Sequence, residues 1–164
     1  MRTFGVLFSC FVIVWWRGDQ MKCCAYSQAV ADIRGENICG TVRFLQRGDG
    51  VMVTAWISGL PHNGFFAFHI HEGPACGGEG FANTGGHFNP AGMPHPEHAG
   101  DLPPLLSAHG KAYLSVLTDR FCVEEVIGRT VVIHGGVDDF TSQPAGNAGT
   151  KIACGVIRRI WCGK

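Results

Sequence analysis

The sequence predicts an all-β fold, an antiparallel sandwich or Greek-key barrel with two long functional loops. The chain has 24 glycines and 8 prolines among 164 residues, about a fifth against a usual eighth, which disfavours long helices. Apolar residues occur in short runs that Gly, Asn, Asp and Pro interrupt, a pattern typical of strands and turns. A helical period of 3.6 residues is only weakly present, around residues 121–127.

About seven strands are expected from the apolar runs. In the run 51–58 the apolar residues alternate with polar ones, as in a half-buried strand, and only Trp56 interrupts the alternation. The expected strands are 29–34, 38–46, 51–58, 65–71, 111–117, 130–134 and 152–157.

Two loops, 72–106 and 135–151, connect the later strands. A connection of more than about 15 residues in a compact domain is usually either functional or disordered. Five of the eight histidines lie in the longer loop or in the strand that enters it. We therefore expect this loop to be functional.

Length and net charge limit the number of domains and the kinds of binding partner. A chain of 164 residues fits one domain, which we assign to residues 26–160. Thirteen basic and thirteen acidic residues give a net charge of zero, so no nucleic-acid partner is expected.

The N-terminal residues 1–25 form a signal-like or anchor segment. An apolar run of 13 residues, 4–16, follows Arg2 and fits a signal-peptide core better than a membrane span of about 20 residues. Export from the cytoplasm is the favoured interpretation, although no clean cleavage site is visible. A retained anchor would give membrane insertion, which is otherwise not expected. Translation from Met21 would leave a cytoplasmic protein.

Six histidines and one aspartate have spacings that suit metal ligands. His69 and His71 lie two apart in one strand, so both rings leave the same face, with about 6.6 Å between their Cα atoms. The others follow along the chain: His87, His95, His98, Asp101 and His134. Seven groups fill two four-coordinate sites only if one histidine serves both ions or one site takes a water. Imidazole-rich ligation suits copper or zinc, and the site with the aspartate is the more zinc-like. His62 and His109 have no partner at ligand spacing and are not expected to bind metal.

Five segments resemble, in order, signature segments of the copper/zinc superoxide dismutase family. The resemblance extends from about residue 29 to residue 157. The segments are FHIHE at 68–72, GHFNP at 86–90, HAGD at 98–101, IGRTVVIH at 127–134 with Asp138 and Asp139, and GNAG at 146–149 with ACGVI at 153–157.

The resemblance implies an eight-stranded Greek-key barrel and a role for each matching residue. Copper would bind to His69, His71, His87 and His134. Zinc would bind to His87, His95, His98 and Asp101, so that His87 is shared. Asp138 would connect a copper histidine to a zinc histidine, and Cys76 would form a disulfide with Cys154.

The implied activity is dismutation of superoxide to oxygen and hydrogen peroxide. Copper(II) would oxidise one superoxide and copper(I) would reduce a second, while His87 carries a proton. Lys151 stands where the family usually has an arginine, so it keeps the charge that attracts superoxide but lacks a planar guanidinium, and reduced activity is expected. The short loop 135–151 has few charges and should steer the anion weakly.

Other functions and features stay open. A non-catalytic copper-binding or copper-delivery protein with the same fold is the alternative, whereas a zinc hydrolase would need an open zinc and a general base, neither of which is indicated. A homodimer is an option. Cys39 and Cys122 are expected to be buried, and the sequence gives no role to Cys10, Cys23, Cys24 or Cys162.

Overall fold

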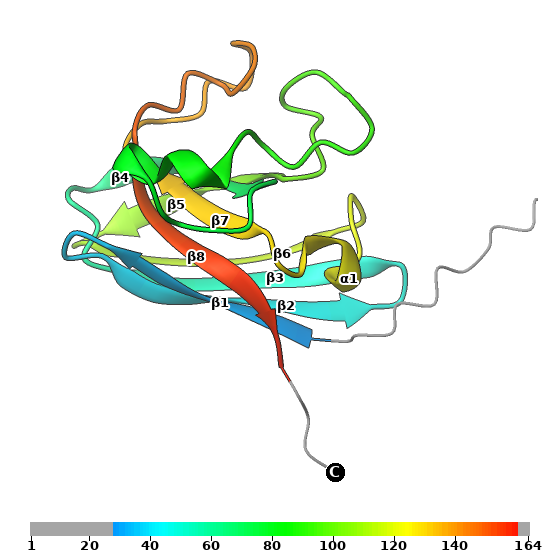
Figure 1. Ribbon diagram of the computed structural model, residues 1–164. Helices are drawn as coiled ribbons and strands as arrows, with labels where there is room; N and C mark the ends of the chain where they lie inside the picture. Colours follow the sequence, from blue (N-terminus) through cyan, green and yellow to red (C-terminus); the bar gives the residue numbers. More distant parts are fainter. Residues whose placement is uncertain (1–27, 161–164) are drawn as a thin grey trace, which may run out of the picture.

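Eight antiparallel strands form a closed barrel in the computed structural model, which describes residues 28–160 (Figure 1). Two short helices lie in the connections, the 3₁₀ helix η1 (Glu79–Thr84) and α1 (Val123–Val126). The strands are β1 (Gln28–Gly35), β2 (Cys39–Arg47), β3 (Gly50–Ser58), β4 (Gly64–His71), β5 (Asp101–Ala108), β6 (Lys111–Thr118), β7 (Thr130–His134) and β8 (Lys151–Arg159). The predicted N-terminal segment 1–25, with Met21, Cys10, Cys23 and Cys24, lies outside the described residues, as does Cys162.

The strand order around the barrel is β1-β2-β3-β6-β5-β4-β7-β8, with β8 closing on β1. The chain passes from β3 across to β4 and from β6 across to β7, so strands distant in sequence become neighbours. These crossovers give the Greek-key arrangement, and the predicted all-β barrel is confirmed.

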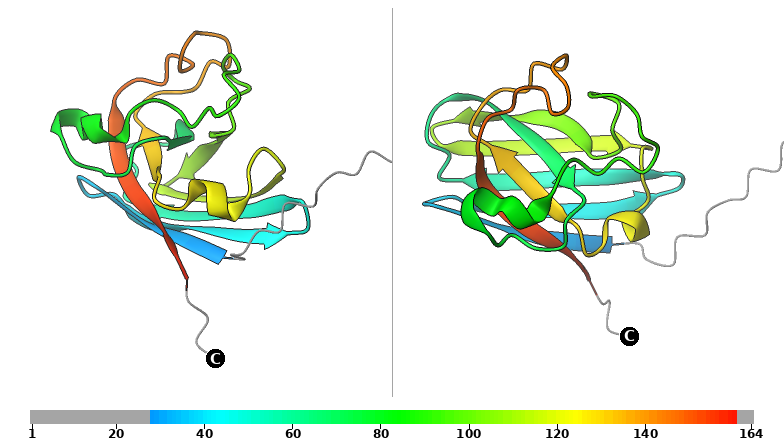
Figure 2. Two further views of the ribbon diagram at one scale, coloured as in Figure 1. Left: turned by 45° about the vertical axis from the view of Figure 1, so that its right-hand side comes forward. Right: turned by 45° about the horizontal axis from the view of Figure 1, so that its top comes forward.

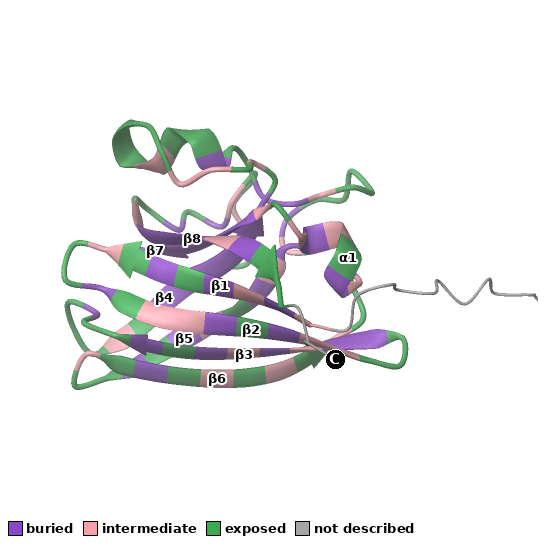
Figure 3. Ribbon diagram, turned by 60° about the horizontal axis from the view of Figure 1, so that its bottom comes forward, coloured by how far each residue is buried: buried purple, intermediate pink, exposed green. Residues whose placement is uncertain are grey.

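Alternating residues divide each strand between core and surface. In β3 the side chains of Val51, Val53 and Ala55 are fully buried, and Figure 3 shows the alternation along β1, β2, β3 and β6. Trp56 obeys the alternation after all, because it lies on the outer face and packs against Tyr113, its cross-strand partner, at 5.6 Å between ring centroids. An exposed aromatic pair therefore explains the apparent interruption of the sequence pattern.

Strand β4 is buried on both faces, unlike β3. Phe66, Phe68 and Ile70 point into the core, and the residues between them point outward. His69 and His71 are nevertheless buried. The outward face of β4 must therefore be covered by the loops, which gives the two histidines an enclosed site.

The residue pattern predicts about seven strands, and the additional one in the structure is β5. It begins at Asp101, inside the expected loop 72–106, so that loop ends at residue 100. Pro103 and Pro104 lie in this strand, and proline is normally a sign against a strand because it has no N–H to donate. The pairing of β5 with β6 is limited to two residue pairs, and its register with β4 contains an irregularity between Phe66 and Phe68. An incomplete ladder of this kind tolerates the prolines.

The expected burial of Cys39 is wrong. Cys39 begins β2 and shares the outward face with Thr41 and Arg43, while Val42 and Phe44 point into the core, so the thiol is exposed. Cys122 is half-buried rather than buried, and it precedes α1, where its backbone N–H donates to the carboxylate of Glu125.

The two long loops lie close to each other, as both views in Figure 2 show, and His95 of the first is hydrogen-bonded to Asp138 and Gln143 of the second. The implied disulfide between Cys76 and Cys154 is present and connects the first loop to β8. Among residues 28–160, no helix is long and apolar enough to cross a membrane.

Candidate metal centre

Two groups of metal-binding side chains meet at one shared histidine. His69, His71, His87 and His134 form the first group, and His87, His95, His98 and Asp101 form the second. Within each group the potential ligand atoms all lie within 4.8 Å of one another. The structure thus brings together all seven residues that the sequence predicts.

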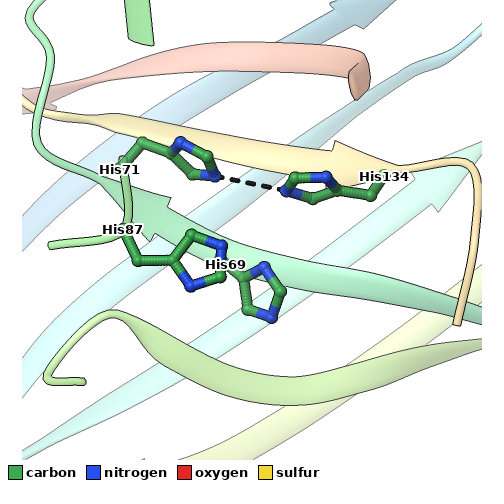
Figure 4. Close-up of side chains that lie close together, drawn as sticks. All are labelled: His69, His71, His87 and His134. Atoms are coloured by element: carbon green, nitrogen blue, oxygen red, sulfur yellow. Dashed lines mark hydrogen bonds between the residues drawn. The ribbon is translucent and has the colours of Figure 1, made fainter. Parts of the chain in front are cut away.

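Backbone pairing places the histidines of the first group. His69 and His71 end β4, and His134 ends the neighbouring strand β7. The first loop turns back so that His87 pairs with His71 in an isolated antiparallel bridge, and Phe88 N–H donates to the Ile70 carbonyl at 2.8 Å. Figure 4 shows the four rings facing a common point.

The hydrogen bonds of the first group leave nitrogen lone pairs directed inward. Nδ1 of His71 donates to the Gly85 carbonyl at 2.9 Å, and Nδ1 of His134 donates to the Gly149 carbonyl at 3.3 Å. In a neutral ring the other nitrogen is then an acceptor. The two Nε2 atoms, joined by the dashed line in Figure 4, are 3.2 Å apart. Two lone pairs at this distance repel each other unless a cation or proton lies between them.

Asp138 connects the two groups. Its Oδ2 accepts from His69 Nε2 at 2.7 Å, and its Oδ1 accepts from His95 Nε2 at 2.8 Å. Each ring is therefore left with a lone pair on Nδ1. Gly146 makes room for this arrangement, because a Cβ there would collide with the Asp138 carboxylate and crowd His95.

Asp101 is the centre of the second group. Nδ1 of His87 lies 2.7 Å from Oδ1 of Asp101, while Nδ1 of His95 and of His98 lie 3.0 and 3.1 Å from Oδ2. The backbone N–H of His98 also donates to Oδ2. Nδ1 of His95 is close to the carboxylate but has no hydrogen bond, which is the expected arrangement for two ligands that face a common ion.

Burial favours the neutral form of three rings of the first group. It lowers the pKa of His69 to about 3, of His71 to about 2 and of His134 to about 4. Burial alone would raise the pKa of Asp101, but its hydrogen bond to His87 and the nearby histidines lower it to about 2. At neutral pH these three histidines therefore offer uncharged imidazoles and Asp101 offers a carboxylate, the forms that bind metal.

Three buried histidine nitrogens indicate whether the two groups could hold metal ions. Nδ1 of His69, Nε2 of His87 and Nδ1 of His95 are buried and have no hydrogen-bond partner among residues 28–160. An unpartnered buried polar atom is costly, and a coordinated ion in each group would satisfy all three. A donor set of imidazoles with one carboxylate suits copper and zinc. The residues fit both metals.

Comparison with known proteins agrees with this chemistry. The model of the family described as copper/zinc superoxide dismutase matches residues 38–157. The chain belongs to the copper/zinc superoxide dismutase family. It is 39% identical over 136 residues to superoxide dismutase [Cu-Zn] 2 of Aquifex aeolicus, which covers 74% of this chain and 80% of the relative.

Further relatives extend the match. Superoxide dismutase [Cu-Zn] 4 of Dictyostelium discoideum is 33% identical over 151 residues, 81% of this chain and 99% of that protein. The crystal structure of the clock protein EA4 superposes with a TM-score of 0.75 at 33% identity, over 82% of this chain and 96% of that chain. The family model, which matches residues 38–157, spans the strands from β2 to β8 and both long loops.

Lys151 begins β8 instead of lying in the loop before it. Its Nζ donates to Thr84 Oγ1 at 2.6 Å and to the Gly85 carbonyl at 3.0 Å. Because His71 Nδ1 donates to the same carbonyl at 2.9 Å, the ammonium lies within about 6 Å of that ring. Thr84 and Gly85 were not singled out in the sequence, where no motif marks them as partners of a lysine.

The two ligand groups found among the described residues do not include His62 or His109. His62 stacks on Phe66 at 4.5 Å between ring centroids. His109 is exposed in the turn between β5 and β6, with a φ of 52°.

Proposed function

We propose that this protein catalyses dismutation of superoxide, with copper bound by His69, His71, His87 and His134 and zinc bound by His87, His95, His98 and Asp101. The observation that carries the proposal is the single histidine, His87, that belongs to both ligand groups. Bound copper would supply the one-electron redox chemistry, and bound zinc would fix the second nitrogen of His87.

The chain's own residues prepare His87 for proton transfer. Asp101 lies 2.7 Å from Nδ1 of His87, which orients the ring. Nε2 of His87 is buried and has no hydrogen-bond partner in the described residues, so it is the atom that can hold a proton for the reduced substrate. Asp138 keeps the neighbouring rings of His69 and His95 in fixed tautomers, an orienting role common around metal ligands.

Lys151 is the proposed guide for the anion. Burial lowers the pKa of its ammonium, but the two hydrogen bonds to Thr84 and Gly85 hold the cation beside His71. A positive charge at this point raises the local concentration of an anionic substrate. This position argues against an ordinary solvent-directed lysine.

Charge reversal at Lys151 should slow the reaction. We expect Lys151→Glu to lower the second-order rate about tenfold at low salt, because the attraction becomes a repulsion close to the site. Lys151→Arg should preserve or raise the rate, since its guanidinium can hold an anion through two parallel hydrogen bonds. Stopped-flow rates at low and high salt measure both effects. Lys111→Glu, the same charge change at an exposed residue outside both ligand groups, is the control; equal, salt-independent rates for all variants would exclude a guiding role.

Removal of the only carboxylate ligand should release zinc. We expect Asp101→Ala to lose zinc while keeping copper, because Asp101 belongs to the second group alone. The loop 72–100 should also become more sensitive to proteases, since Asp101 accepts hydrogen bonds from His87 and from His98 N–H. Metal analysis and limited proteolysis measure the two effects. Zinc bound with wild-type affinity would show that the ligand set is wrong.

The alternative is a non-catalytic copper-binding or copper-delivery protein, which the replacement of the usual arginine by Lys151 favours mildly. One experiment separates the two functions: metal analysis of the purified protein, combined with superoxide consumption at defined copper loading. Turnover that rises in proportion to bound copper supports the dismutase. Stoichiometric copper without turnover would identify a binding protein.

We also propose that the protein is exported. The apolar run 4–16 fits a signal-peptide core, and the disulfide between Cys76 and Cys154 is typical of oxidising compartments. Fractionation of the producing cells, with N-terminal sequencing of the mature protein, tests the proposal. An intact N-terminus in the membrane fraction would indicate a retained anchor, and a cytoplasmic protein that begins at Met21 would exclude export.

A further inference from the structure

The segment 95–101 carries three of the seven ligands, and a side chain from the other long loop holds its backbone. The Gln143 amide donates from Nε2 to the His95 carbonyl at 2.7 Å, and its Oε1 accepts from the His95 N–H at 3.0 Å. One side chain thus satisfies both backbone groups of a single ligand residue. Asp138, from the same loop, binds the ring of His95 at Nε2. His95 is therefore fixed at its backbone N–H, its carbonyl and its ring.

Arg120 holds the same segment from another side. It follows β6, and its Nη1 lies 2.9 Å from the carbonyl oxygen of Pro96, 3.2 Å from that of His98 and 3.3 Å from that of Asp101. These carbonyls accept the hydrogen bonds, because a guanidinium can only donate. Arg120 thus binds the backbone of two ligand residues, His98 and Asp101, and of Pro96, which follows the third ligand.

The segment supplies few backbone contacts of its own. Its one internal backbone bond joins Asp101 N–H to the His98 carbonyl, and Glu97 N–H donates to Pro94 just before the segment. Gly100 bonds to Phe88 and Ile70 at the C-terminal end, so the part around His95 and Pro96 has the least backbone support, and Pro96 has no N–H to donate. Ligand side chains on a loose loop would lose affinity, since ordering the loop costs entropy when the ion binds. External hydrogen bonds that order the loop beforehand reduce this cost.

We propose that Gln143 and Arg120 are positioning residues that prearrange the second ligand group for its metal ion. This inference rests on the zinc assignment made under the proposed function. Neither side chain coordinates the ion; each acts through the backbone of the ligand segment. The expected effect is that of other outer partners of metal ligands, whose loss lowers metal affinity about 10- to 100-fold.

The test uses Co²⁺ as a spectroscopic probe of the zinc site in the full-length, metal-free protein. The visible bands that disappear in Asp101→Ala define the signal from the second group. Co²⁺ affinity, measured by competition with a chelator, is compared for wild type, Gln143→Ala, Gln143→Leu, Arg120→Ala and Arg120→Lys. The control is Arg47→Ala, because Arg47 is exposed at the end of β2 and belongs to neither ligand group. Far-UV circular dichroism checks that each variant keeps the barrel.

We expect Gln143→Ala and Gln143→Leu to weaken Co²⁺ binding equally and to alter the bands at saturation, because leucine keeps the bulk but not the hydrogen bonds. Arg120→Lys should retain more affinity than Arg120→Ala, since an ammonium can still donate to carbonyls. Wild-type affinity and bands in all four variants would overturn the inference while leaving the zinc assignment intact. Affinity kept by leucine but not alanine at position 143 would also overturn it, in favour of packing. Absence of any Co²⁺ signal sensitive to Asp101→Ala would overturn the zinc assignment as well.

Discussion

Replacement of His134 by alanine should abolish dismutase activity while leaving the barrel folded. His134 belongs only to the first ligand group, and its Nε2 faces that of His71 at 3.2 Å. The removal of one of four ligands should release copper. The core packing of β7 is unchanged, because Val131 and Ile133 point inward and His134 does not. Metal content, stopped-flow superoxide consumption and thermal unfolding measure the three effects.

A second imidazole provides the control for His134→Ala. His109 is exposed and belongs to neither ligand group, and His109→Asn suits its positive φ, which asparagine tolerates. This variant should keep full copper and full activity. Activity retained by His134→Ala at full copper loading would refute the copper assignment.

The sequence predicts the parts of the structure that depend on local periodicity. Alternation along β3 identifies its buried face, and the spacing of His69 and His71 in β4 places both rings on one side. Counting donors leaves two options, a shared histidine or a water ligand at one site, and the structure shows His87 in both groups. These predictions are possible because strand geometry and coordination number each depend on only a few residues.

Other features depend on contacts between distant segments, which periodicity does not encode. The residue pattern does not predict strand β5, because Pro103 and Pro104 are typical of loops and the strand depends on its pairing with β4 and β6. The Gln143 side chain binds the backbone of His95, 48 positions away. Every residue has backbone hydrogen-bonding groups, so the type of residue at position 95 does not reveal this contact. The bridging position of Asp138 is expected from the family resemblance alone, because an aspartate in a loop is by default a solvated acid.

Removal of the disulfide should lower the free energy of unfolding by a large fraction of its usual value. The bond between Cys76 and Cys154 closes a loop with a sequence separation of 78 residues. The loop-entropy model gives a stabilisation of about 4 to 5 kcal/mol for a loop of this length. Since a typical domain has a free energy of unfolding of about 5 to 15 kcal/mol, Cys76→Ser/Cys154→Ala should unfold at a much lower urea concentration. Alanine is chosen at position 154 because that side chain is buried, where a serine hydroxyl would need a partner.

The matched control is Cys39→Ser, which removes an exposed thiol that forms no disulfide within the described part of the chain. Its free energy of unfolding should change by less than about 0.5 kcal/mol, as is usual for surface substitutions. The disulfide variant should also lose activity below its unfolding transition, because η1 contacts β8 and includes Thr84, which holds Lys151. Equal urea midpoints for the disulfide variant and Cys39→Ser would mean that the barrel is stable without the crosslink. In that case the bond would serve mainly to hold the loop that positions Lys151, and the rate would fall without a change in stability.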